Sequence, residues 1–161
     1  ALPGGPVYVL TGLLQALEGP DELAGVLGHE LGHVVLRHHV RNLGRSVGLA
    51  VGIGLLFGDV DGFTGALIGA SGDLATLAFS REQETEADDF GARLAAKAGY
   101  DPAALARFFG RLEGPALPAL LRSHPASEER ERALGALVPT LGPRAGKAPG
   151  PTLEALAAGC R

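Results

Sequence analysis

Apolar residues recur every three or four positions along much of this chain, which is the spacing of helices with one buried face. The clearest run follows DELAGVLGHELGH, where the spaced residues are Leu23, Val26, Leu27 and Val34. Asp21 stands where a helix N-cap is expected, and Gly44 is a natural stop. We therefore predict one long helix over residues 21–44.

Other segments carry weaker versions of the same signals. Val7, Tyr8 and Val9, bracketed by glycines and a proline, predict a short edge strand within residues 4–12. Two further helices are a short one at LLQALEG and a polar one that is capped by Ser80 and ends at Gly99. A third starts at Asp101-Pro102, and a fourth is opened by Ser127 or the SHP turn. The Pro/Gly-rich tail carries one more short helix. The pattern predicts a mainly α fold with a small β edge (α+β).

The segment 46–79 is composed of glycine and aliphatic residues. Asp59, Asp61 and Asp73 interrupt it, so each uncharged run is shorter than the roughly 20 residues that a membrane-spanning helix needs. Two interpretations stay open: a pair of buried helices joined at GDVDG, or a lid or hairpin that makes peripheral contact with a membrane.

Composition narrows the class of protein. The chain has 161 residues, 46% hydrophobic and 20% charged, which predicts one folded domain. Its net charge of -4 and the absence of a basic run argue against nucleic-acid binding. The single cysteine, Cys160, can form neither an internal disulfide nor a thiol metal site by itself. A metal would have to be held by His, Glu or Asp.

The sequence HELGH, from His29 to His33, has the HExxH spacing. Residues four apart on a helix differ by about 40° around the axis, so both imidazoles project to one side and can reach one metal ion. Neutral imidazole suits Zn²⁺, and Glu30 is placed to deprotonate a water at that metal. This pattern is typical of peptide hydrolysis.

A catalytic zinc site needs a third protein ligand. Glu84 lies on the small-residue face of its predicted helix, so it can approach the HExxH helix closely, whereas Glu82 and Glu86 lie off that face and are expected to be solvated. Asp88, one turn after Glu84, could accept the free ring N–H of a zinc-bound histidine.

The remaining histidines separate into two groups. On a continuous helix His38 would lie roughly 140° around from His33, so His38 and His39 are expected to be surface residues. His124 precedes a proline in an extended turn, and Arg130 follows six residues later.

Taken in order, ALPGGPVYVLTGLL, GHELGHV, SREQETEAD and SHPASEERERAL resemble a family of membrane-associated zinc metallopeptidases. This family includes the HtpX, BepA and CaaX prenyl endopeptidases (metallopeptidase family forty-eight, gluzincin type), and the chain is most similar to the soluble BepA-like members. The resemblance implies one zinc ion per chain, with His29, His33 and Glu84 as ligands, Glu30 as general base and Asp88 behind the ligands. It also implies that His124 and Arg130 face the zinc. His124 and Arg130 would then be catalytic residues that stabilise an oxyanion, or His124 would instead block the fourth zinc position, and the sequence does not choose between these roles.

The resemblance also implies a zincin-like domain in which the active-site helix packs against the glutamate-bearing helix. We expect this domain to span residues 1–137, without the upstream β segment usual in the family, and to be followed by a tail over 138–161. The expected function is a zinc metalloendopeptidase acting on peptides or unfolded proteins, in quality control of envelope or membrane proteins. The expected location is extracytoplasmic, either periplasmic or membrane-associated. The alternative is a zinc-bound but proteolytically silent chaperone or scaffold, with His124 blocking the metal.

Overall fold

The described part of the chain is helical. The computed structural model describes residues 6–57, 79–111, 124, 127–142 and 150–158, and no strand occurs within these ranges. Its helices are α1 (Thr11–Ala16), α2 (Pro20–Val35), α3 (His38–Phe57), α5 (Arg81–Lys97), α6 (Ala104–Arg111), α8 (Glu128–Leu141) and α9 (Leu153–Ala158). The predicted mainly α class is confirmed.

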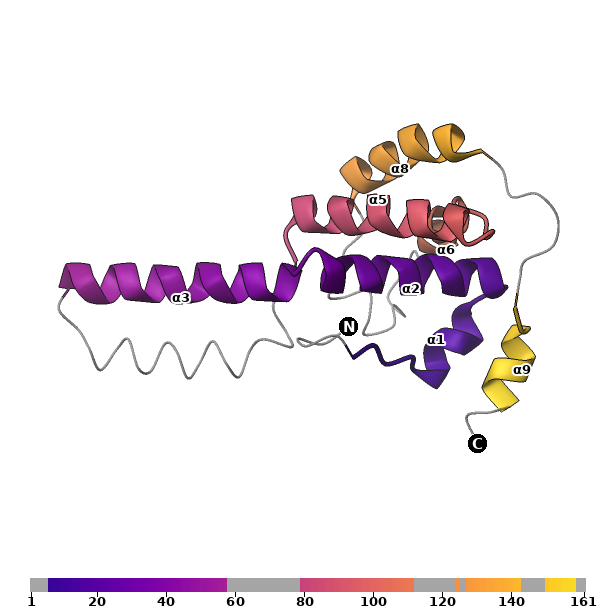
Figure 1. Ribbon diagram of the computed structural model, residues 1–161, viewed down its shortest axis with the longest axis horizontal. Coiled ribbons are helices and arrows are strands. Elements are labelled where there is room, and N and C mark those ends of the chain that lie inside the picture. Colours follow the sequence, from indigo (N-terminus) through magenta and orange to yellow (C-terminus); the bar gives the residue numbers. More distant parts are fainter. Residues whose placement is uncertain (1–5, 58–78, 112–123, 125–126, 143–149, 159–161) are drawn as a thin grey trace.

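Helices α2 and α5 lie side by side at the centre of the molecule, and α8 packs on α5 (Figure 1). Helix α6 also contacts α2. Helix α3 continues roughly in the direction of α2 and projects beyond the other helices, whereas α1 and α9 lie at the opposite end (Figure 1). The HExxH motif and Glu84 therefore lie on the central pair of helices.

The strand expected at Val7, Tyr8 and Val9 is not formed. Tyr8 is 69% exposed, and these residues have no strand to pair with in the described part of the chain. Leu10 has an extended backbone and ends the segment that precedes α1. Its carbonyl oxygen already accepts hydrogen bonds from the backbone N–H groups of Leu13 and Leu14, so the helix begins there. β preference makes a strand only where a neighbouring strand supplies the hydrogen bonds.

The long helix predicted over residues 21–44 is two helices. Helix α2 begins at Pro20, and the Asp21 carboxylate accepts a hydrogen bond from the Asp101 backbone N–H instead of capping α2. The chain then breaks after Val35, where Arg37 adopts a left-handed φ of 56°, and α3 begins at His38. The break resets the helical phase, so angles extrapolated from α2 do not apply beyond it.

The signals for the later helices are confirmed. Ser80 and Gln83 form a reciprocal capping box at the start of α5, and Gly99 follows that helix with a φ of 85°. The Ser127 side chain accepts a hydrogen bond from the Arg130 backbone N–H at the start of α8.

An apolar core lies where α1, α2 and α6 meet. Its buried residues are Leu13, Leu14, Leu17, Leu23, Val26, Leu105 and Phe108. Leu153 and Leu156 of α9 pack against this core, although the proposed division of the chain after residue 137 stays a prediction.

Helices α2 and α5 approach closely because small residues face each other. A Cβ atom added to Gly28 would lie 3.0 Å from the Cα of Gly91, and one added to Gly32 would lie 3.0 Å from the Cα of Ala87. This contact agrees with the small-residue face expected for the Glu84 helix. It lets short side chains on both helices reach a common point.

Only the beginning of the glycine-rich segment is described, as the second half of α3. Residues 58–78 lie outside the described residues, and with them the GDVDG junction and most of the expected lid or membrane hairpin. Among the helices that the structure describes, none combines the length and apolarity needed to span a membrane.

Candidate metal centre

Four buried side chains from three segments converge between α2 and α5. His29 and His33 project from α2, Glu84 from the first turn of α5, and His124 from the turn that precedes α8. One donor atom from each lies within 4.8 Å of the other three. All four side chains are buried, with His33 at 0% and His124 at 5% exposure.

The spacing of the donor atoms fits a zinc ion. The Nε2 atoms of His29 and His33 are 3.0 Å apart, and His33 Nε2 lies 3.4 Å from Oε1 of Glu84. A tetrahedral zinc with bonds of about 2.0–2.2 Å would separate its donors by roughly 3.3–3.6 Å. Two imidazoles and a carboxylate are also the donor types of catalytic zinc sites. The residues present therefore fit the metal that the sequence predicts.

The electrostatics of the cluster also suit a cation. Burial, together with the imidazoles of His29 and His124, holds the pKa of His33 far below its usual range, so that its ring is neutral and keeps a free lone pair. Within the described part of the chain, Oε2 of Glu84 accepts no hydrogen bond, although Nη1 of Arg130 lies 3.0 Å away as an ion-pair partner. A buried carboxylate oxygen in this state has capacity left for a metal ion.

His124 lies inside the cluster. Its Nδ1 atom is 2.9 Å from Oε1 of Glu84 and 3.2 Å from Nε2 of His29. Its other ring nitrogen, Nε2, lies 3.4 Å from Oε1 of Glu30. His124 can therefore reach both the metal position and the carboxylate beside it.

Glu30 is buried but ionised. Burial alone would raise its pKa, yet its charged surroundings, foremost the His124 ring with Nε2 3.4 Å from Oε1 of Glu30, hold that pKa below its usual value. The carboxylate therefore has no proton at neutral pH and is available to accept one.

Asp88 supports the cluster from behind. Its Oδ1 atom lies 2.7 Å from Nδ1 of His29, and Arg130 donates hydrogen bonds from Nε and Nη2 to the two carboxylate oxygens, at 2.7 and 2.8 Å. Although burial opposes it, these hydrogen bonds keep the pKa of Asp88 below its usual value. An ionised Asp88 fixes the His29 ring with Nε2 toward the metal position.

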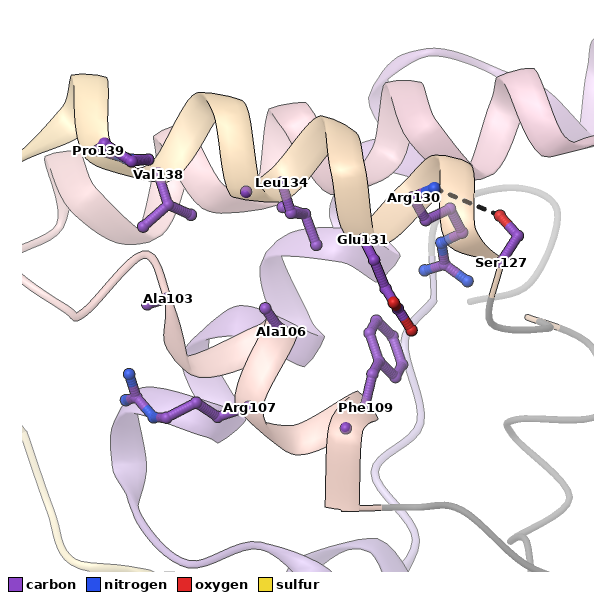
Figure 2. A pocket seen from close by; sticks show the side chains of 12 residues that line it. Ala103, Ala106, Arg107, Phe109, Ser127, Arg130, Glu131, Leu134, Val138 and Pro139 are labelled. Atoms are coloured by element: carbon purple, nitrogen blue, oxygen red, sulfur yellow. Dashed lines mark hydrogen bonds between the residues drawn. The ribbon is translucent and has the colours of Figure 1, made fainter.

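Arg130 ties this support to the rest of the fold. Nη1 donates to the carbonyl oxygen of His124 at 3.2 Å, and the guanidinium carbon lies 4.7 Å from the centre of the Phe109 ring. Figure 2 shows Arg130 on the first turn of α8, beside Phe109 of α6. Both residues line a cavity of about 480 Å³ between these helices. Arg130 thus holds Asp88, Glu84 and the His124 backbone together.

His38 corrects an expectation. It was expected at the surface, but its side chain is fully buried, and its Nδ1 atom lies 2.9 Å from Nδ1 of His33. Nε2 of His38 lies 2.9 Å from Oε2 of Glu86, which is partly exposed as expected and also accepts a hydrogen bond from Arg41. The expectation was wrong because it assumed a continuous helix, whereas the break at Arg37 turns His38 back toward His33.

The structure brings together all the residues that the sequence singled out for the site, namely His29, Glu30, His33, Glu84, Asp88, His124 and Arg130. It adds His38, Glu86 and Phe79, whose ring stacks on His33 at a centroid distance of 3.9 Å. No signal in the sequence marks the non-glycine residue Arg37 for a left-handed conformation, so these additions required the tertiary structure.

Comparisons with known proteins place the chain among metallopeptidases. A model described as Peptidase family M48 matches residues 1–138. Mitochondrial metalloendopeptidase OMA1 of Arabidopsis thaliana is 36% identical over 136 residues, which cover 83% of this chain and 28% of that protein. Metalloprotease LoiP of Escherichia coli is 33% identical over 138 residues, covering 81% of this chain and 54% of LoiP. A putative beta-barrel assembly-enhancing protease of Vibrio cholerae is 32% identical over 148 residues, which cover 79% of this chain and 29% of that protein. The chain therefore spans between about a quarter and about half of the length of these relatives.

Proposed function

The chain belongs to peptidase family M48, and from this membership we propose that it is a zinc-dependent metalloendopeptidase that hydrolyses peptides or unfolded proteins. The observation that carries the proposal is the donor cluster of His29, His33 and Glu84 with the ionised Glu30 beside it.

In the proposed reaction His29, His33 and Glu84 hold one zinc ion. When bound, zinc supplies Lewis acidity, which polarises a substrate carbonyl and lowers the pKa of water. The Glu30 carboxylate accepts a proton from the attacking water and then gives it to the leaving amine nitrogen. Asp88 keeps the His29 ring oriented, and Arg130 compensates the charge of Asp88 and Glu84. In this role Arg130 is a positioning residue, because its N–H groups are directed at Asp88 and His124.

Glu30→Gln tests the peptidase proposal. The substitution keeps the size of the side chain but removes the proton acceptor, so cleavage of unfolded casein should fall by about 100-fold or more while zinc content is unchanged. His33→Ala should lose stoichiometric zinc in elemental analysis. Equal casein cleavage by wild type and Glu30→Gln would refute the peptidase proposal for this chain.

A second candidate function is supported by the position of His124. Because Nδ1 of His124 lies among the donor atoms of His29 and Glu84, it could occupy the fourth zinc position and keep the site closed. The chain would then act as a zinc-bound chaperone or scaffold. His124→Ala separates the two: casein cleavage should rise if His124 blocks the metal, and should fall if His124 stabilises the oxyanion.

We further propose quality control of envelope proteins, in the periplasm or at a membrane, as the biological role. The support is the name of the relative from Vibrio cholerae, a putative beta-barrel assembly-enhancing protease, although other relatives are named as mitochondrial. Cell fractionation tests the location. Recovery of the protein only in the cytoplasmic fraction would exclude this role.

A further inference from the structure

His33 has a buried support of its own, separate from the support that Asp88 gives to His29. We propose that His38 and Glu86 are positioning residues that fix the ring of His33 for metal binding through a continuous chain of hydrogen bonds. The inference rests on the proposed function, since it assumes that Nε2 of His33 binds the metal.

The chain of contacts is short and leads outward from the metal position. Nδ1 of His33 lies 2.9 Å from Nδ1 of His38, and Nε2 of His38 lies 2.9 Å from Oε2 of Glu86. Both imidazoles are 0% exposed, so water does not compete for the bond between them. The last member, Glu86, has a 36% exposed side chain and accepts a second hydrogen bond from Nη1 of Arg41 at 2.7 Å. This series of hydrogen bonds thus begins at the buried ring of His33 and ends at the Glu86 carboxylate near solvent.

Donor and acceptor roles determine which ring nitrogen of His33 and of His38 carries a proton. A metal on Nε2 of His33 uses the lone pair of that atom and leaves its proton on Nδ1. That N–H can donate to His38 only if Nδ1 of His38 is unprotonated, which places the proton of His38 on Nε2. The Nε2–H group then points at Glu86, a carboxylate that can only accept. The geometry is consistent with one arrangement of protons, and it orients the His33 lone pair toward the metal.

The junction of α2 and α3 and its contacts with α5 keep these hydrogen-bonding residues in place. The left-handed Arg37 ends α2 and places His38 at the start of α3, directly against His33. From α5, Gln83 donates to the Asn42 side chain at 2.8 Å and reaches the carbonyl oxygen of His38 at 3.5 Å. The start of α3 is thereby fastened to the helix that carries Glu86.

His29 and His33 consequently differ in how they are supported. His29 contacts the Asp88 carboxylate directly, whereas an imidazole stands between His33 and the Glu86 carboxylate. Groups that orient a metal-binding histidine typically change metal affinity about 10- to 100-fold when they are removed. Loss of Glu86 should therefore weaken zinc binding although Glu86 does not reach the metal position.

Glu86→Ala, Glu86→Gln and the control Glu82→Ala test the proposal. Glu82 is exposed on the same helix, so its substitution reproduces the loss of a carboxylate without the contact to His38. The zinc dissociation constant is measured by competition with a chromophoric chelator. We expect about 10- to 100-fold weaker binding for Glu86→Ala, and a smaller loss for Glu86→Gln because its amide oxygen still accepts the Nε2–H of His38. Glu82→Ala should bind zinc as wild type does.

A second measurement separates positioning from a general structural effect. Nitrogen-15 NMR of the zinc-loaded wild type should show the proton of His38 on Nε2, with Nδ1 unprotonated. A proton on Nδ1 of His38 would overturn the proposal, as would a zinc dissociation constant for Glu86→Ala within about twofold of that for Glu82→Ala. If the wild type bound no zinc, the proposed function itself would fail, and that outcome is distinct from unchanged affinity in the Glu86 variants.

Discussion

Replacing Gly91 by alanine would test whether close contact between α2 and α5 creates the metal centre. A Cβ atom at this position would lie 2.7 Å from the backbone nitrogen of His29 and 3.0 Å from the carbonyl carbon of Gly28. Both obstacles are backbone atoms, so no side-chain rotation can relieve them. To move from 2.7 Å to the 3.4 Å of an ordinary contact, the helices must separate locally by about 0.7 Å.

The expected magnitude follows from two opposing effects. Alanine at a helical glycine favours the helix by up to about 1 kcal/mol, whereas overpacking in a close contact costs about 1–3 kcal/mol. Gly44→Ala is the matched control, because Gly44 is helical and a Cβ there meets nothing within 4 Å. Gly44→Ala should therefore raise the free energy of unfolding by up to about 1 kcal/mol. The free energy of unfolding of Gly91→Ala should be about 1–3 kcal/mol lower than that of Gly44→Ala.

Urea denaturation followed by circular dichroism measures the free energy of unfolding of both variants, and chelator competition measures their zinc affinity. Metal–ligand distances tolerate only about 0.2 Å, so separation of the helices should weaken zinc binding by roughly tenfold or more in Gly91→Ala. Gly44→Ala should keep the wild-type affinity. If Gly91→Ala were as stable as the control and bound zinc equally well, the close-contact argument would be refuted.

Three further predictions concern groups around the site. Ser80→Ala removes the capping box that starts α5, so the free energy of unfolding should fall by about 1 kcal/mol in urea titrations, and an unchanged value would contradict the capping role. Asp88→Asn should weaken zinc binding by about 10- to 100-fold in chelator competition, because the amide places N–H donors against Arg130, and wild-type affinity would count against the support of His29. Although burial opposes it, hydrogen bonds from Arg111 hold the pKa of Glu22 below the 4.5 of the unfolded chain. The pair therefore stabilises the fold above pH 4.5, and this contribution disappears as pH falls through the lower pKa of the folded state. Arg111→Gln should accordingly destabilise the protein at neutral pH and much less in acid, and an equal loss at both would contradict the linkage.

Several features of the site follow from local sequence periodicity. His29 and His33 share a helical face because they are four residues apart, and the small-residue face of α5 selected Glu84 over Glu82. The capping signals at Ser80 and Ser127 also predicted where α5 and α8 begin. In each case the relevant interactions are confined to a few neighbouring residues, so the sequence alone contains the information.

Other features depend on interactions between distant segments. Val7–Val9 have β preference, but without a partner strand in the described part of the chain they form none. A left-handed conformation at Arg37 costs free energy locally, by about 1–2 kcal/mol for a non-glycine residue, and is retained only if the rest of the fold stabilises it. No local pattern predicts such a conformation.

The sequence by itself thus predicted the helix that carries HExxH, Glu84 as the third ligand, and the chemistry that these residue types support. Tertiary structure decided what surrounds the ligands. It buried His38 against His33, paired it with Glu86 across 48 positions of sequence, and brought His124 within 3.2 Å of His29 from 95 positions away. The physical reason is that helix phase is set by backbone geometry within a few residues, whereas these contacts exist only once α2, α3, α5 and the turn before α8 have packed together.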